Sequence, residues 1–183
     1  MIEAIVFDLD GTLVDSDQAL DDAFRACGVP DEEITHGHVL ADECARLGIT
    51  VDAYLAVYDP SKVRAFAGVD DMLSALDRRW AVCSNKRGEI GPLELDALGW
   101  SPEVALFADS FDGPKRLGPV LDALELGASE VLFVGDTDHD RLAASDVGCA
   151  FAWAGWNPRV QPGDGTVARR PADVMTLAAQ LSG

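Results

Sequence analysis

The sequence predicts an α/β fold, a doubly wound parallel sheet of the Rossmann-like type with a small helical region inserted after the first strand. From residue 68 onward, short apolar runs alternate with amphipathic stretches, which is the pattern of successive βαβ units. Between residues 17 and 67 the apolar residues recur at helical spacing, and no strand-like run interrupts them. A chain of 183 residues with 48% hydrophobic composition is long enough for one core carrying a small insertion.

The periodicity places the elements in order along the chain. The first strand is the apolar run 3–7, and three helices follow at 17–27, 38–48 and 51–59, the first two stopping at Gly28 and Gly48. The second half of the chain is expected to contain helices at 69–79, 90–99, 117–127, 140–148 and 171–181, and strands at 80–84, 104–110, 130–136 and 149–155. The Gly/Pro-rich stretch 155–166 is expected to form a surface loop.

The charge balance is strongly acidic. Asp and Glu number 32 against 14 Lys and Arg, which gives a formal net charge of −18. This balance disfavours nucleic acid as a partner. Our hypothesis is that the chain is halophilic and works in a salt-rich cytoplasm, where screening shortens the reach of self-repulsion. An ordinary acidic protein in ordinary salt is the alternative.

The sequence also predicts a cytoplasmic protein without a membrane partner. Its N-terminus lacks the pattern of a signal peptide, and no apolar run approaches the length of a membrane span. The cysteines are scattered without a CxxC pair, so we expect reduced, buried thiols at Cys27, Cys44, Cys83 and Cys149.

Polar side chains follow the expected strands at the point where each strand ends. In a parallel sheet these strand ends meet at one edge, so their side chains are expected to converge. Two aspartates separated by one residue repel each other, and a hard divalent cation of the Mg²⁺ type relieves that repulsion. The converging residues are Asp8 and Asp10, Ser84 and Asn85, Asp109 with nearby Lys115, and Asp136 with Asp140.

These residue types together indicate a site for a phosphoryl group. Gly11 allows a sharp turn whose backbone N–H groups can point at an anion, Ser84 adds a hydroxyl donor and Lys115 adds a positive charge. A carboxylate at Asp8 is then a candidate nucleophile, and Asp10 is a candidate general acid and base.

The same residues resemble the haloacid dehalogenase superfamily of phosphotransferases. Four segments carry the resemblance, in the order of the family's four motifs. They are "DLDGT" at residues 8–12, "CSNK" at residues 83–86, the lysine at position 115, and "VGDTDHD" at residues 134–140. It spans residues 2–15 and about 68–181. It implies a core formed by residues 1–15 and 68–183 and a helical cap formed by residues 16–67.

The resemblance also implies a role for each motif residue. Asp8 is expected to be the nucleophile and Asp10 the acid/base residue, while Ser84 and Lys115 bind the phosphoryl oxygens. Mg²⁺ would be held by a carboxylate oxygen of Asp8, the backbone carbonyl of Asp10 and the carboxylate of Asp136, with Asp140 supporting these ligands. The full set of expected substrate-binding residues is Gly11, Thr12, Ser84, Asn85 and Lys115.

The segment "DLDGTLVDS" with a helical cap is similar to the branch of phosphoglycolate phosphatases and β-phosphoglucomutases. This similarity implies a Mg²⁺-dependent phosphatase of small phosphate monoesters, with 2-phosphoglycolate as a candidate substrate and an aspartyl-phosphate intermediate. A phosphomutase and an inactive binding module stay open as alternatives. The cap is short for this branch, and the sequence leaves the physiological substrate and the oligomeric state undetermined.

Overall fold

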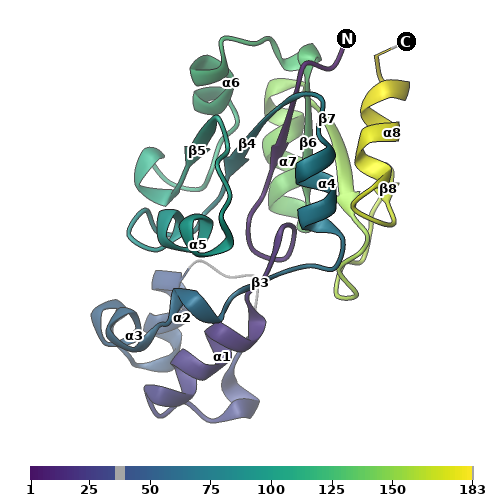
Figure 1. The fold of residues 1–183 in the computed structure, drawn as a ribbon. Helices are drawn as coiled ribbons and strands as arrows, with labels where there is room; N and C mark the ends of the chain where they lie inside the picture. The colour runs from purple at the N-terminus through teal and green to yellow at the C-terminus, as the bar shows by residue number, and fades with distance from the viewer. Residues whose placement is uncertain (36–39, 183) are drawn as a thin grey trace.

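The core of the molecule is a parallel sheet of six strands in the order β5-β4-β1-β6-β7-β8, and every neighbouring pair in it is parallel. The computed structural model describes residues 1–35 and 40–182. The predicted α/β fold with a parallel sheet is confirmed (Figure 1). The strands are β1 Ala4–Phe7, β4 Arg79–Cys83, β5 Val104–Leu106, β6 Val131–Gly135, β7 Ala150–Ala154 and β8 Thr166–Ala168.

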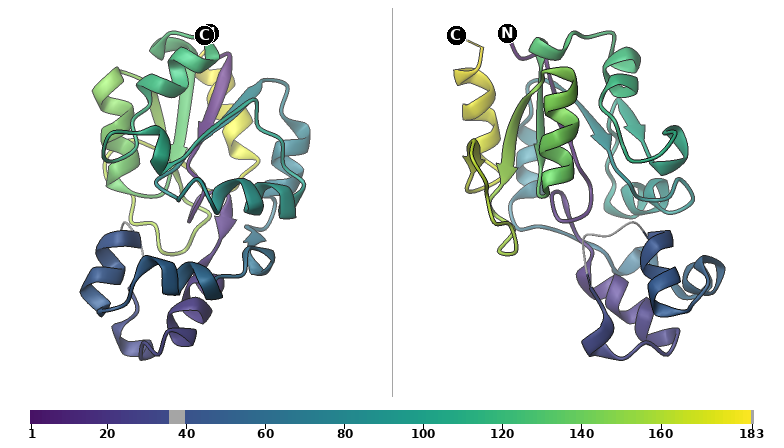
Figure 2. Two further views of the ribbon diagram at one scale, coloured as in Figure 1. Left: turned by 90° about the vertical axis from the view of Figure 1, so that its left-hand side faces the viewer. Right: turned by 180° about the vertical axis from the view of Figure 1, so that it is seen from behind.

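Helices cover both faces of the sheet because the central strands are apolar on both sides. In β1, Ile5 and Phe7 face one hydrophobic cluster and Ala4 and Val6 face the other. The first cluster receives α4 Val69–Ala75, α5 Gly91–Leu98 and α8 Asp173–Gln180, and the second receives α6 Gly118–Leu124 and α7 Asp138–Val147 (Figure 2). Alternate residues of β1 therefore pack against the helical layers on the two faces of the sheet.

Two segments of the core differ from the prediction. The expected strand 104–110 ends after β5, and residues Ala108–Ser110 form a 3₁₀ turn, η3. The ring of Phe107, which precedes this turn, packs directly against Gly91, where a Cβ would lie 2.0 Å from the ring. Strand β8 was not predicted, since its three residues are too few for a periodic pattern to appear. A further 3₁₀ turn, η4 Ala128–Glu130, leads into β6.

A group of short helices lies at the carboxyl ends of the strands, below the sheet in Figure 1. It contains α1 Asp17–Ala26, η1 Asp31–Glu33, α2 Leu40–Leu47, α3 Val51–Val57 and η2 Pro60–Lys62. Residues 38 and 39 of the helix expected at 38–48 lie outside the described residues. The ring of Tyr54 packs at a tilt against Phe24, with a centroid distance of 4.8 Å, and stacks on Tyr58 at 5.6 Å, so these rings connect α1 with α3.

The connections into and out of this helical group form an unpredicted two-stranded antiparallel ribbon. It pairs β2 Val14–Asp15 with β3 Arg64–Ala65. Two residues per strand are too few to recognise from alternation, and the partners are about 50 residues apart in the chain. The ribbon brings both connections together beside the end of β1.

The cysteine prediction holds for two of the four residues. All four thiols are free, and Cys44 and Cys83 are buried, whereas Cys27 and Cys149 are only partly buried. None of the helices in the described part of the chain is long and apolar enough to cross a membrane.

We expect the unfolding temperature of this protein to rise with KCl concentration. The net charge of −18 means that acidic side chains greatly outnumber basic ones and repel one another in the folded state, and salt screens this repulsion. Thermal unfolding followed across a KCl series measures the effect, and an uncharged osmolyte at equal osmolality is the control. Equal or greater stability in dilute buffer would contradict the halophilic hypothesis.

Candidate active site

Asp8 is the first residue beyond β1 and is almost fully buried, with 5% of its surface exposed. Its backbone N–H donates to the carbonyl of Val134 at 2.9 Å, which extends the pairing of β1 with β6 by one residue. The backbone of Asp8 is therefore held by the sheet, and its carboxylate starts from a fixed position. Burial raises the pKa of Asp8 well above its ordinary value, and the nearby ammonium of Lys115 offsets part of that rise.

Lys115 joins two aspartates from different strand ends. Its Nζ contacts Oδ1 of Asp8 and lies 2.5 Å from Oδ1 of Asp140, and the side chain is 4% exposed. Burial alone would lower the pKa of Lys115, but the charges of Asp140 and Asp8 outweigh burial and raise it. The side-chain oxygen of Asn85 accepts a hydrogen bond of 2.7 Å from the Lys115 backbone N–H, which positions the lysine against the end of β4.

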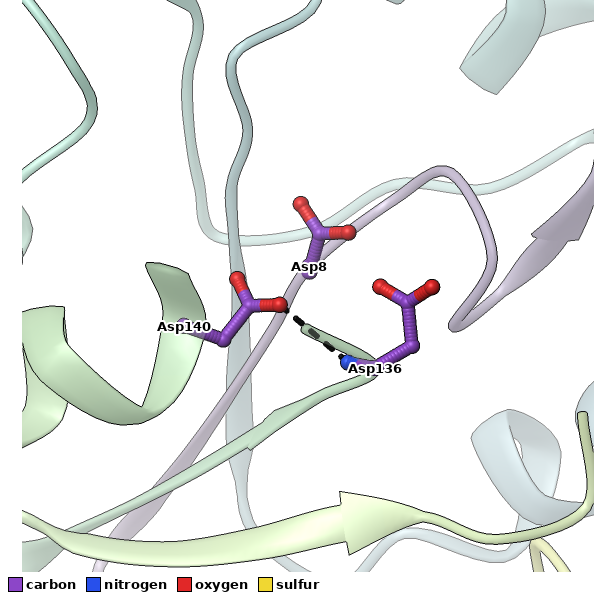
Figure 3. A group of neighbouring side chains, drawn as sticks. All are labelled: Asp8, Asp136 and Asp140. Carbon is purple, nitrogen blue, oxygen red and sulfur yellow. Dashed lines mark hydrogen bonds between the residues drawn. The ribbon is translucent and has the colours of Figure 1, made fainter. Parts of the chain in front are cut away.

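Asp8, Asp136 and Asp140 form the acidic cluster drawn in Figure 3. One carboxylate oxygen from each lies within 4.8 Å of the others. Oδ2 of Asp140 accepts hydrogen bonds from the backbone N–H groups of Asp136 at 3.2 Å and Thr137 at 2.9 Å, so Asp140 holds the loop after β6. Burial and the charge of Asp140 raise the pKa of Asp136 to about 7.

The donor set of this cluster suits a hard divalent cation. Carboxylate oxygens are the ligands that Mg²⁺ prefers. Burial raises the pKa values of Asp8 and Asp136 although Lys115 lies near both, so a further positive charge at this cluster would be favourable. The predicted ligands Asp8 and Asp136 are thus brought together. The carboxylate of Asp10 is bound elsewhere, since its Oδ1 lies 2.7 Å from Nζ of Lys86.

The turn after Asp10 must contain glycine at residue 11. Gly11 has φ +78°, and a Cβ there would lie 2.2 Å from Oδ2 of Asp136. Its N–H donates to the carbonyl of Val14 and that of Thr12 to the carbonyl of Leu9, so these amides are used inside the turn. The Thr12 hydroxyl faces Asp136 at 3.5 Å. Gly11 and Thr12 therefore pack against Asp136 of the acidic cluster. The backbone N–H groups of these two residues are both used within the turn, so neither is free for the expected contact with an anion.

The stretch 155–166 is the irregular and mostly exposed loop that its composition predicts, except that two side chains near its start turn inward. Asn157 is 3% exposed and donates from Nδ2 to the Gly11 carbonyl at 2.8 Å, while Trp156 donates from Nε1 to the Thr12 carbonyl at 2.8 Å. These two side chains hold the turn at residues 11 and 12, which follows Asp8 and Asp10. Glycine and proline content predicts irregular backbone correctly, but it carries no information on which side chains turn inward.

The other strand-end residues divide into two groups. Ser84 is buried and, like Asn85, lines the cavity beside Asp8. Asp109 lies apart from this set, because its Oδ2 accepts a hydrogen bond of 2.9 Å from the backbone N–H of Gly88. The structure thus brings Asp8, Ser84, Asn85, Lys115, Asp136 and Asp140 together at one edge, with Asp10 beside them.

Sequence reasoning gave no role to Lys86, although it is part of the "CSNK" motif, and did not single out Glu94. Lys86 Nζ lies 2.6 Å from both carboxylate oxygens of Glu94 and 2.7 Å from Asp10, and neither the Lys86 nor the Glu94 side chain is more than 6% exposed. A signal was present, since Lys86 is one of only three lysines in the chain and follows Ser84 by two residues.

A cavity of about 790 Å³ opens over these residues, within the range of small-molecule sites. The sheet edge contributes Asp8, Ser84, Lys115 and Asp136 to its lining, and the helical group contributes side chains that include Phe24, Arg46, Tyr54 and Tyr58. The helical group therefore forms the opposite wall of the site.

Comparison with known proteins identifies the family. The model of the family described as haloacid dehalogenase-like hydrolase matches residues 5–154, so the chain belongs to this family. The predicted resemblance is confirmed.

Individual relatives agree with this assignment. A phosphoglycolate phosphatase from Xanthomonas campestris pv. campestris (strain 8004) is 27% identical in an alignment that covers 94% of this chain and 90% of the relative. An N-acetylmuramic acid 6-phosphate phosphatase from Pseudomonas aeruginosa is also 27% identical, over 82% of this chain and 80% of the relative. A HAD-superfamily hydrolase of subfamily IA, variant 1, from Geobacter sulfurreducens has the same fold, with a TM-score of 0.79 at 21% identity over 97% of this chain and 100% of that one.

Proposed function

We propose that the protein is a Mg²⁺-dependent phosphatase that hydrolyses small phosphate monoesters through a phosphoryl group on Asp8. The observation that carries this proposal is that one lysine, Lys115, contacts the buried carboxylates of both Asp8 and Asp140. Asp136 and Asp10 lie at the same edge of the sheet. The names of the phosphatases in Xanthomonas and Pseudomonas support the same class of substrate.

In the first step, a carboxylate oxygen of Asp8 forms a bond to phosphorus while the bond from phosphorus to the ester oxygen breaks. Asp10 gives a proton to the departing oxygen, so the product leaves as an alcohol. In the second step, Asp10 takes a proton from water as the water oxygen attacks phosphorus, and the bond to Asp8 breaks to release phosphate.

The remaining residues of the site would stabilise the phosphoryl group during both steps. Lys115 and the Ser84 hydroxyl face the space beside Asp8 and offer positive charge and a hydrogen bond to its oxygens. Mg²⁺, held by Asp8, Asp136 and the Asp10 backbone carbonyl, would supply further positive charge there when bound.

We further propose that residues 16–67 act as a cap over a core of residues 1–15 and 68–183, and that the protein works in the cytoplasm. The position of the helical group across the cavity from Asp8 supports the cap, and a cavity of about 790 Å³ favours a small metabolite as substrate. The cytoplasmic assignment depends on the sequence features alone.

Phosphate release from a panel of monoesters tests this function. The panel contains 2-phosphoglycolate, N-acetylmuramic acid 6-phosphate, sugar phosphates and nucleotides, assayed with Mg²⁺ in concentrated KCl and again with EDTA. Release that requires Mg²⁺ and favours one ester would support the proposal and give the substrate. Interconversion of sugar phosphates without release would indicate a mutase, and a folded protein that acts on no ester would leave only a binding role.

We expect Mg²⁺ to raise the unfolding temperature at neutral pH and to lose this effect in acid. Folding raises the pKa of Asp136 to about 7, above the value of about 4 for an unfolded aspartate. Without metal, the folded state therefore holds the proton more tightly, and its stability falls as pH rises through this window. Mg²⁺ binds the ionised form, so its stabilising effect should grow over the same pH range.

Thermal unfolding with MgCl₂, against KCl of equal ionic strength, measures this effect at each pH. The Asp136→Asn variant is the control and should show little response to Mg²⁺. A shift in unfolding temperature that is independent of pH and unchanged in the variant would place the metal elsewhere.

A further inference from the structure

A buried lysine, Lys86, contacts the proposed acid/base residue but has no part in the steps described above. Its Nζ lies 2.7 Å from Oδ1 of Asp10, and its side chain is only 6% exposed. This contact holds one oxygen of Asp10 and leaves Oδ2 as the oxygen for proton transfer. Among the described residues, the metal-type cluster contains Asp8, Asp136 and Asp140 and does not include the Asp10 carboxylate.

Lys86 is itself fixed by a second carboxylate. Both oxygens of Glu94, in the first turn of α5, lie 2.6 Å from Nζ of Lys86, and the Glu94 side chain has no exposed surface. A buried ion pair of this kind is costly to desolvate and adds little to stability compared with apolar residues of similar size. Its geometry is better explained by orientation of Asp10 than by stability.

Glu94 connects this pair to the helical group. The hydroxyl of Tyr58, which follows α3, donates to Oε1 of Glu94, and Nζ of Lys86 lies 5.7 Å above the Tyr58 ring. A continuous chain of polar contacts therefore runs from Tyr58 through Glu94 and Lys86 to Asp10. Through these contacts, the orientation of the Asp10 carboxylate depends on the position of the helical group.

We propose that Lys86 is a positioning residue for Asp10, and that Glu94 and Tyr58 link its position to the seating of the cap. This inference rests on the proposed phosphatase function. Lys86 directs Oδ2 of Asp10 toward the ester oxygen in the first step and toward water in the second, and the proton itself moves on Asp10. Loss of Lys86 should therefore impair proton transfer while the attack by Asp8 is retained.

The test compares two esters in the Lys86→Met variant. An alkyl phosphate needs a proton on its departing oxygen, whereas p-nitrophenyl phosphate has a good leaving group and does not. We expect kcat/KM for the alkyl ester to fall on the order of 10²-fold, the lower end of general acid catalysis, and kcat/KM for p-nitrophenyl phosphate to change little. The kcat for p-nitrophenyl phosphate should still fall, because hydrolysis of the intermediate needs Asp10 as a base.

Two further variants guard against loss of folding. Lys86→Met combined with Glu94→Gln removes both buried charges together, and Tyr58→Phe removes only the hydroxyl that contacts Glu94. Each should show the same selective loss for the alkyl ester, smaller in Tyr58→Phe. Lys62→Met, which alters an exposed lysine paired with Asp22, is the matched control and should not discriminate between the esters.

A merely structural role for Lys86 gives a different result. In that case folded variants would lose kcat/KM equally for both esters, or lose none, and either outcome would overturn the inference while the phosphatase function stands. If the wild-type protein releases phosphate from neither ester, the proposed function and this inference both fail.

Discussion

The Asp8→Asn variant is expected to lose phosphate release by a factor on the order of 10⁴ or more, as enzymes do when their nucleophile is removed. The amide nitrogen and oxygen of asparagine cannot form the bond to phosphorus that the Asp8 carboxylate forms. The fold should survive, because asparagine has nearly the same shape and burial of the Asp8 charge is costly, as its raised pKa shows. Steady-state rates with the best ester of the panel measure the loss.

Asp109→Asn is the matched control for this variant. Asp109 also follows a strand of the same sheet, but its side chain contacts the backbone of Gly88, and an amide oxygen can accept the same hydrogen bond. Its activity should stay close to that of the wild type. An equal loss in both variants would mean that any change at this sheet edge disables the protein, and the role of Asp8 as nucleophile would lose its support.

The Lys115→Met variant is expected to be both inactive and strongly destabilised. The substitution leaves Asp8 and Asp140 buried without the cation that contacts both of them. Breaking a buried ion pair in this way costs about 3–5 kcal/mol in the free energy of unfolding. The loss should be smaller at acidic pH, where carboxylates take up protons, and Mg²⁺ should recover part of it at neutral pH.

Denaturant unfolding of Lys115→Met beside Lys62→Met measures this difference. Lys62 makes an ion pair of 2.8 Å with Asp22 on the surface of the helical group, and surface pairs of this kind add little to stability. The unfolding midpoint of Lys62→Met should stay near that of the wild type. Similar midpoints for Lys115→Met and the wild type would contradict the buried charge network described for this site.

The convergence of the strand ends could be predicted from the sequence because it depends on local pattern and one topological rule. Apolar runs that end at Asp8, Ser84 and Asp136 mark buried strands, and a parallel sheet brings their carboxyl ends to one edge. Helical spacing likewise predicts the helices on both faces. These features need only the few residues on either side of each position.

Other features could not be predicted because they depend on contacts between distant parts of the chain. The β2–β3 ribbon pairs Val14 with Ala65 through two-residue strands, which are too short for any periodicity. Asn157 turns inward to bind the Gly11 carbonyl, although its neighbours have the composition of an exposed loop. Lys86 and Glu94 are charged residues, which are usually exposed, and only the packing of α5 against the helical group shows that they are buried.

The most direct test of the central claim is to locate the phosphoryl group during turnover. We would mix the Asp10→Asn variant with p-nitrophenyl phosphate and Mg²⁺, quench in acid and map the modified residue by peptide mass spectrometry. Asp10 is not needed for this leaving group but is needed to activate water, so the account predicts a rapid release of one nitrophenolate per active site and a phosphoryl group on Asp8. Continued nitrophenolate release with no phosphoryl group on Asp8 at any time would contradict the account.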